Sequence, residues 1–278
     1  MKERVTLTIE KNILEQVDQS VDGSKIKNRS HAVELLITKA LGTHKPTKAL
    51  ILAGGKGIRL RASGEETPAC MMRFKDKPIL EYNIELLKKY GINEIYLFVG
   101  ENSGAIESYF GDGRKLDVKI QYVKEKAALG TAGPLRAIRS QVKETFVVMN
   151  ADELKDIDLN DMYRFHCESS GLCTMAITTL SDPTDYGVVV LNGNQIMQFI
   201  EKPSPNAPSN LVNAGLYIFE PDVLDLVPEG FAMLENDVFP KLVKMSKLYG
   251  YPFAGTWTDL NLQQKIKFKI KKVKKVLV

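Results

Sequence analysis

Residues 52–78, LAGGKGIRLRASGEETPACMMRFKDKP, contain the side chains best suited to binding phosphate groups. The glycines of this stretch are Gly54, Gly55, Gly57 and Gly64, and the cations of the same loop are Lys56, Arg59 and Arg61. Glycine permits positive φ and close approach of the backbone, so that successive N–H groups can converge on phosphate oxygens. We therefore interpret the stretch as a phosphate-binding loop, with a plain surface turn as the alternative. A Walker A loop is excluded, because no Gly-Lys-Ser/Thr follows at the required spacing.

This loop follows an apolar run, 49–52, and begins a region in which strand-like and helix-like segments alternate. The predicted strands are 48–53, 94–100, 119–125 and 146–152, and the predicted helices are 79–91, 102–113 and 130–142. Such alternation predicts an α/β fold with a Rossmann-like, mostly parallel, doubly wound sheet. Ligands of these sheets bind at the carboxyl ends of the strands, which is where Gly54, Gly130 and Asp152 fall.

Composition limits the class of protein. The 278 residues are 44% hydrophobic and 26% charged with a net charge of +4, which is ordinary for a soluble globular chain. The three cysteines lack the spacing of a metal site or the number needed for a disulfide framework, so we expect free thiols and a cytoplasmic location. No signal core or 18-residue apolar run is present, and no membrane span is expected.

The first forty or so residues have a different pattern. Residues 4–10 alternate apolar and polar side chains, which predicts a half-buried strand. A helical segment follows, and a second helix is expected after Ser30 as its N-cap. One strand and two helices are too few to bury a core alone, so we expect this unit to dimerise.

Over residues 3–42 the chain resembles the ribbon-helix-helix DNA-binding family, including KNRSHAV at the start of the second helix. The resemblance implies a homodimer, or a higher even oligomer, whose paired strands enter the major groove of double-stranded DNA. By position, Arg4, Thr6 and Thr8 would face base edges, while Arg29 and the N–H groups at Ser30 would bind a phosphate. The alternative is an oligomerisation unit that reads no DNA.

A second resemblance covers residues 48–262 and rests on several motifs in order. They are LAGGKGIRL, KPIL (77–80), LGTAGPL (129–135), NAD (150–152), EKP (201–203), NAGLYIF (213–219), END-FP around Asp237, and WTDL (257–260). The region is similar to the sugar-1-phosphate nucleotidylyltransferases, the nucleotide-sugar pyrophosphorylases. We therefore predict four segments: a ribbon-helix-helix domain (1–43), a linker (44–48), a nucleotidyltransferase domain (49–262) and a lysine-rich tail (263–278).

In that family a sugar phosphate oxygen attacks the α-phosphate of a nucleoside triphosphate and pyrophosphate leaves. Positioning and charge neutralisation supply most of the catalysis. By position, Asp152 and Asp259 would hold Mg²⁺, Lys202 would pair with the sugar phosphate, and Arg59 would neutralise the triphosphate. The resemblance assigns the nucleotide to Leu52, Ala53, Gly54, Gly55, Gly57, Arg59 and Gly130, and the sugar phosphate to Gly187, Glu201, Lys202 and Asn213. Without the flanking motifs, the aspartates would read as a turn cap and a surface charge, and Glu201–Lys202 as a surface pair.

One departure concerns turnover. Ten residues after the loop arginine the family has a cationic Pro-Lys pair, where this chain has Pro68-Ala69. Loss of one preorganised charge donor costs about 3–4 kcal/mol of transition-state stabilisation. Two functions follow. In the first, which the missing lysine favours, a DNA-binding regulator senses nucleoside triphosphate, sugar phosphate or nucleotide-sugar with weak or absent catalysis; in the second, an active Mg²⁺-dependent nucleotidylyltransferase uses its N-terminal module for dimerisation or autoregulation.

Overall fold

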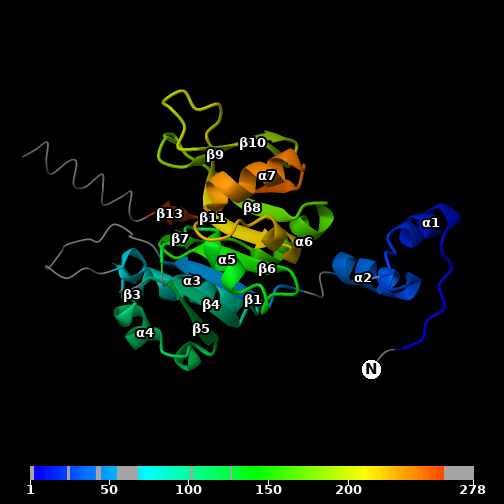
Figure 1. The fold of residues 1–278 in the computed structure, drawn as a ribbon, viewed down its shortest axis with the longest axis horizontal. Helices are drawn as coiled ribbons and strands as arrows, with labels where there is room; N and C mark the ends of the chain where they lie inside the picture. The colour runs from blue at the N-terminus through cyan, green and yellow to red at the C-terminus, as the bar shows by residue number, and fades with distance from the viewer. Residues whose placement is uncertain are drawn as a thin grey trace, which may run out of the picture. The chain divides into compact units, whose positions relative to one another are not determined.

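The computed structural model describes residues 3–23, 26–41, 45–54, 68–100, 103–125 and 127–259. The chain divides into two compact units, Met1–Lys45 and Pro46–Val278 (Figure 1). The predicted tail 263–278, and Gly55, Gly57 and Arg59 of the phosphate-binding loop, lie outside the described residues. No helix among the described residues has both the length and the apolar character needed to cross a membrane.

The smaller unit contains two helices, α1 (Lys11–Gln19) and α2 (Arg29–Leu41). Val17 of α1 and Ala32 of α2 are buried. Arg29 fastens the two helices together: its Nε and Nη2 each donate a hydrogen bond of 2.6 Å to the carboxylate of Asp18. The guanidinium that was predicted to bind DNA phosphate therefore already has an acidic partner.

Two local predictions for this unit do not match the structure. Residues 4–10 form no strand within the described chain, because a strand needs hydrogen bonds from a second strand and none is offered here. Val5 and Leu7 are accordingly 70% and 55% exposed. The prediction of Ser30 as N-cap is wrong: α2 begins at Arg29, and the side chain of Asn28 caps it by accepting a 2.9 Å hydrogen bond from the His31 backbone.

The larger unit is built on a sheet whose strands, within the described residues, have the order β5-β4-β1-β6-β11-β8-β12-β10-β9 (Figure 1). These strands are β1 (Lys48–Ala53), β4 (Glu94–Val99), β5 (Lys119–Lys124), β6 (Phe146–Asn150), β8 (Cys173–Thr179), β9 (Gly187–Asn192), β10 (Gln195–Glu201), β11 (Leu211–Phe219) and β12 (Leu248–Pro252). Two small ribbons accompany it, β2 (Arg73–Phe74) with β3 (Lys77–Pro78), and β7 (Glu153–Lys155) with β13 (Trp257–Asp259).

The prediction of an α/β fold is confirmed, but the sheet is mixed instead of mostly parallel. Strands β5, β4, β1 and β6 are parallel to one another, as predicted. β11 then runs antiparallel to both β6 and β8. β9 and β10 are joined by the short turn at Gly193, and strands connected so closely must be antiparallel.

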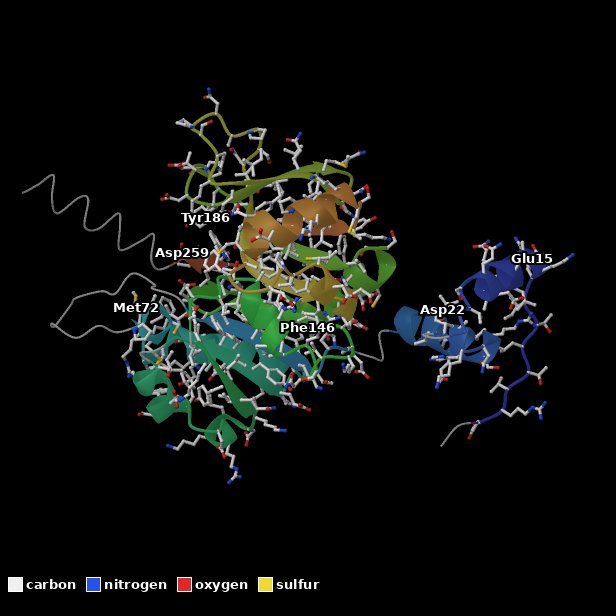
Figure 2. The ribbon with its side chains drawn as sticks, viewed as in Figure 1. Glu15, Asp22, Met72, Phe146, Tyr186 and Asp259 are labelled. Atoms are coloured by element: carbon white, nitrogen blue, oxygen red, sulfur yellow. The ribbon has the colours of Figure 1, made fainter. Side chains whose placement is uncertain are left out.

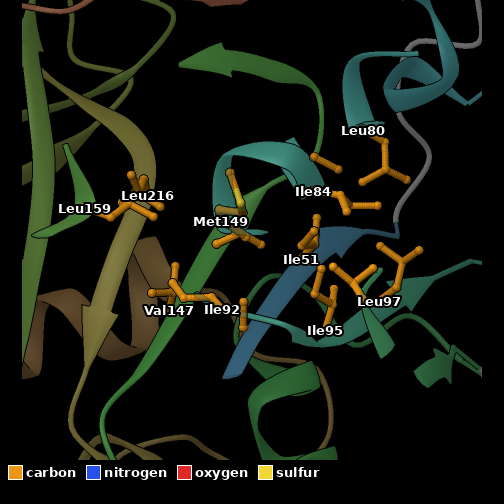
Figure 3. Packing of buried hydrophobic residues seen from close by; sticks show 14 of the residues in the cluster. Ile51, Leu80, Ile84, Ile92, Ile95, Leu97, Val147, Met149, Leu159 and Leu216 are labelled. Atoms are coloured by element: carbon orange, nitrogen blue, oxygen red, sulfur yellow. The ribbon is translucent and has the colours of Figure 1, made fainter. Parts of the chain in front are cut away.

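Helices cover both faces of the sheet. They are α3 (Ile79–Lys89), α4 (Gly104–Phe110), α5 (Gly133–Ala137), α6 (Leu159–Glu168) and α7 (Phe239–Lys244). Successive residues of a strand point to opposite faces, so Ile51 joins the cluster beneath α3, α4 and α6 while Leu50 joins the one beneath α5 and α7. Figure 3 shows the first cluster, in which Leu80 and Ile84 of α3 pack near Ile51. The helix predicted over 130–142 is shorter in the structure, covering only Gly133–Ala137.

Candidate active site

The carboxyl end of the central parallel strands brings the first two motifs together. Leu52 of β1 lies opposite Asn150 of β6, and the Ala151 N–H donates to the Leu52 carbonyl at 3.3 Å. Gly54 follows at the end of β1, where a Cβ atom would stand only 2.2 Å from the ring of Phe98. Only glycine fits beside this ring, so the start of the predicted phosphate-binding loop is held against the strand ends.

Asp152 lies two residues beyond β6, close to the segment that carries the departure from the family. Pro68 precedes a single helical turn, Ala69–Met71, in which Ala69 and Cys70 are buried. Burial, followed by the charge of Asp152, raises the pKa of the Cys70 thiol to about 12. The turn begins at Ala69, where the family has its lysine. It is therefore close enough to Asp152 for the charge of that residue to affect the pKa of Cys70.

Asp259 reaches the same end of the sheet through the β7–β13 ribbon. In this antiparallel pair Asp259 lies directly opposite Glu153, the residue that follows Asp152. The two predicted metal ligands, 107 positions apart in the sequence, are thus carried on neighbouring backbone positions. The sequence pattern alone does not predict that β7 pairs with β13. This pairing brings the segments of the two aspartates together.

Tyr186 lies near Asp259 (Figure 2) and connects it to the predicted sugar-phosphate residues. Its hydroxyl donates to Oδ2 of Asp259 at 3.1 Å, and its carbonyl accepts from the Lys202 N–H at 3.0 Å. Burial, and after it the charge of Asp259, raises the pKa of Tyr186 well above its usual value, so the phenol stays protonated and remains a donor. Sequence reasoning missed this residue, which directly precedes Gly187 of the predicted site.

Lys202 occupies a backbone conformation that side-chain-bearing residues seldom adopt, with φ at +45°. Its side chain is 66% exposed, and Nζ lies 3.7 Å from Oε1 of Glu201. Residues held in such conformations are concentrated at ligand sites, where surrounding structure maintains the strain. The ammonium is therefore presented toward solvent from a fixed backbone position.

Glu201 and Gly187 face each other across β10 and β9. A Cβ at Gly187 would lie 2.5 Å from the ring of Phe199 and 3.0 Å from Oε2 of Glu201, so glycine is needed for this approach. Burial, and then the charge of Glu235, raises the pKa of Glu201. Glu201 therefore binds a proton more readily than an exposed glutamate does.

The side chain of Asn213 already has two partners inside β11. Its Nδ2 donates to the Tyr217 hydroxyl at 2.8 Å, and its Oδ1 accepts from the Gly215 N–H at 2.9 Å. These bonds close the irregularity of β11 between Asn213 and Tyr217. The predicted sugar contact is therefore also a structural clamp, and only its remaining hydrogen-bonding capacity is open to a ligand.

Gly130 brings the LGTAGPL motif against a distant segment. With φ at +72°, its Cβ position would lie 2.3 Å from the carbonyl oxygen of Ala232. Next to it, the hydroxyl of Thr131 donates to Oε2 of Glu235 at 2.7 Å. The charge of Glu235 also raises the pKa of Glu201. The Thr131–Glu235 contact therefore connects the predicted nucleotide side of the site with the predicted sugar side.

The donors suit a magnesium ion that is bound partly by substrate. Among the described residues no group of three or more His, Cys, Asp or Glu side chains is arranged to hold a metal by itself. Two aspartates on adjoining backbone positions leave most of a coordination shell to other oxygens. Mg²⁺ is typically held in this way, by one or two carboxylates with phosphates and water completing six positions.

Comparison with known proteins gives consistent matches for the larger unit. A family model described as Nucleotidyl transferase matches residues 48–264. Mannose-1-phosphate guanyltransferase beta-A of Xenopus laevis is 38% identical over 219 residues, covering 77% of this chain and 61% of that protein. UTP–glucose-1-phosphate uridylyltransferase of Synechocystis is 37% identical over 235 residues, covering 77% of this chain and 60% of that protein. The chain thus spans about three fifths of the length of these relatives.

Solved structures match the fold. UDP-glucose pyrophosphorylase complexed with UDP-glucose has a TM-score of 0.67 at 22% identity, covering 83% of this chain and 99% of that one. HddC of Yersinia pseudotuberculosis complexed with GMP-PN has a TM-score of 0.64 at 21% identity, covering 77% of this chain and 94% of that one. At these identities the similarity establishes the architecture of the larger unit.

Proposed function

Because the chain belongs to the nucleotidyl transferase family over residues 48–264, we propose that it joins a nucleoside triphosphate to a sugar 1-phosphate. A phosphate oxygen of the sugar 1-phosphate attacks the α-phosphorus of the triphosphate. The new bond is the P–O bond of a nucleoside diphosphate sugar, and the bond to the β-phosphate breaks to release pyrophosphate. The observation that carries this proposal is the β7–β13 pairing, which puts Asp259 opposite the neighbour of Asp152.

Each side of the site has a task in this reaction. Leu52, Ala53 and Gly54 would hold the nucleotide at the ends of the strands, with Gly130 beside it. Lys202 would neutralise the sugar phosphate, while Glu201 would accept hydrogen bonds from sugar hydroxyls. Asp152 and Asp259 would hold Mg²⁺, which would supply positive charge to the phosphates when bound. Gly55, Gly57 and Arg59 keep their predicted role at the triphosphate.

The relatives suggest which substrates to try first. Their names include mannose-1-phosphate guanylyltransferase and UTP–glucose-1-phosphate uridylyltransferase. We therefore propose GTP with mannose 1-phosphate as the first pair, and UTP with glucose 1-phosphate as the second. With Ala69 in place of the family's lysine, turnover is expected to be slow, by roughly 10²- to 10³-fold. The reaction is then the same as in the rest of the family, with a lower rate.

The test measures both products. The full chain is incubated with Mg²⁺ and each substrate pair, and pyrophosphate and the nucleotide sugar are quantified together by coupled assay and mass spectrometry. The Asp152→Asn/Asp259→Asn variant is the negative control. Equal yields of the two products, absent from the control, support the proposal; the absence of both products with every triphosphate and sugar phosphate pair would overturn it.

DNA binding by residues 1–43 stays a second prediction, with the larger unit sensing its ligands as a regulator. One observation favours it: Arg4, Thr6 and Thr8 are all exposed, with no partner strand in the described chain covering their neighbours Val5 and Leu7. A second copy pairing along this segment would bury Val5 and Leu7 and leave the three polar side chains outward. Arg4→Ala with Thr6→Ala should then weaken salt-dependent duplex binding, and unchanged affinity would exclude this strand as the reader.

A further inference from the structure

The β7–β13 ribbon contains a buried ion pair that none of the predicted roles uses. Nζ of Lys155 lies 3.1 Å from Oε2 of Glu153, with side chains 0% and 10% exposed. Oε2 also accepts from Nε1 of Trp257 at 2.8 Å, and Oε1 accepts from Nδ2 of Asn150 at 3.0 Å. Both carboxylate oxygens of Glu153 are therefore engaged in a buried setting.

This arrangement ties together the two backbone segments that carry the predicted metal ligands. Glu153 directly follows Asp152, and Trp257 is two residues before Asp259. On antiparallel strands, Glu153, Lys155, Trp257 and Asp259 share one face of the ribbon, because each lies at an alternate position and 153 faces 259. The Trp257–Glu153 hydrogen bond thus joins the segment that contains Asp152 to the strand that contains Asp259.

The strand that carries Asp259 is short, Trp257–Asp259. In the described residues β13 pairs only with β7, in a ribbon separate from the main sheet. A two-stranded ribbon of this length is marginally stable by itself. Tyr186 supports the aspartate from one side, through its hydroxyl and through the packing of its ring against Trp257 at 5.3 Å. Glu153 contacts the same strand through its hydrogen bond from Trp257.

A buried ion pair is weak evidence for stability, because apolar residues of similar size often stabilise a fold as well or better. What apolar residues would not supply is a directed bond to the indole N–H. We infer that Glu153, neutralised by Lys155, is a positioning residue: it fixes β13 through Trp257 so that Asp152 and Asp259 are spaced to share one divalent cation. This inference rests on the proposed function for the presence of the metal, and it adds residues that the motifs did not single out.

The experiment compares variants with the charge pair removed as a unit, since a lone buried charge would unfold the ribbon. Glu153→Ala/Lys155→Met removes the acceptor for Trp257, whereas Glu153→Gln/Lys155→Met keeps an oxygen acceptor in its place. Trp257→Phe removes the donor and keeps an aromatic ring. Glu107→Gln/Lys124→Met is the matched control, because that ion pair of 2.9 Å lies on an exposed surface of the chain.

Binding of Mn²⁺ is measured by electron paramagnetic resonance on the full chain without substrates, and thermal unfolding is recorded for each variant. Trp257 is the single tryptophan of the chain, so acrylamide quenching of its emission reports on this ribbon alone. Glu153→Ala/Lys155→Met should show stronger quenching and at least tenfold weaker Mn²⁺ binding, and Trp257→Phe the same loss of affinity. The Gln variant should stay within about threefold of the wild type, as should the exposed control.

Mn²⁺ affinities within threefold of wild type in both Trp257→Phe and the Ala variant would overturn the inference, as would absence of Mn²⁺ binding to the wild type. An equal loss of affinity in the exposed control would overturn it as well. A wild-type chain that binds Mn²⁺ but forms no nucleotide sugar would contradict the proposed function while leaving the positioning role in place.

Discussion

The Tyr186 hydroxyl donates a 3.1 Å hydrogen bond to Oδ2 of Asp259. This bond restricts the rotation of the carboxylate and so fixes the direction in which its oxygens point. The same tyrosine holds the Lys202 N–H through its carbonyl. Tyr186 therefore contacts both the proposed metal ligand Asp259 and the backbone of Lys202, which is proposed to bind the sugar phosphate.

Replacing Tyr186 by phenylalanine should weaken the use of Mg²⁺. Hydrogen bonds to charged groups are worth about 1.5–3 kcal/mol, so the Mg²⁺ concentration for half-maximal turnover should rise by roughly tenfold or more. Tyr109→Phe is the matched control, since Tyr109 donates to Glu81 at 2.8 Å on an exposed surface. A Mg²⁺ titration of nucleotide-sugar formation checks this, and identical curves for the two variants would contradict it.

Gly215→Ala should destabilise the larger unit and displace Glu153. Gly215 has φ at +59°, and a Cβ there would lie 2.4 Å from Nδ2 of Asn150 and 2.7 Å from Oε1 of Glu153. Backbone strain and overpacking together should lower the free energy of unfolding by about 2–4 kcal/mol. Gly193 is the control, because its φ is nearly the same, +58°, and the space around it is open. Urea unfolding of Gly193→Ala should show a free energy of unfolding only about 1 kcal/mol lower than that of the wild type.

Ala69→Lys should raise turnover. Restoring a cation near the reacting phosphates is expected to increase kcat by roughly 10²-fold if the rest of the site is sound. Ala69→Met provides a similar chain length without charge and should not increase the rate. The comparison is made from initial rates of pyrophosphate release; equal rates for the lysine and methionine variants would show that the missing charge does not limit catalysis.

Thiol alkylation should distinguish the three cysteines. Cys70 and Cys173 are buried, and burial raises the pKa of both thiols, that of Cys70 to about 12. A raised thiol pKa means less thiolate at a given pH: at pH 8 the reactive fraction of Cys70 is on the order of 10⁻⁴. Iodoacetamide should therefore modify the half-buried Cys167 first, and peptide mapping by mass spectrometry checks the order. Rapid labelling of Cys70 in the native chain would contradict it, whereas all three should react in denaturant.

Elements that depend on local pattern were predictable from the sequence. β1 and the neighbouring strand β4 follow continuous apolar runs, and α3 follows its helical spacing. The start of α2 was misplaced because Asn28 and Ser30 are both good caps, and only the hydrogen bond from His31 shows which one is used. The segment 4–10 has a strand pattern but no partner in the single chain.

The site was predictable in its motif residues and not in its connections. The bond between Glu153 and Trp257 joins residues 104 positions apart, and no periodicity predicts such a pairing. No motif marks Glu153 and Lys155, and their burial is seen only in the folded chain. Tyr186 likewise gains its role only when β13 brings Asp259 to it. The mixed sheet was also not predicted, because it depends on a contact between distant parts of the sequence: β11 lies between β6 and β8.

The late position of β13 has a consequence for how the protein matures during synthesis. Every strand of the main sheet precedes residue 253, whereas Asp259 lies on the last described strand. Asp259 is therefore synthesised after every strand of the main sheet. The two proposed metal ligands can come together only once β13 has been made and has paired with β7.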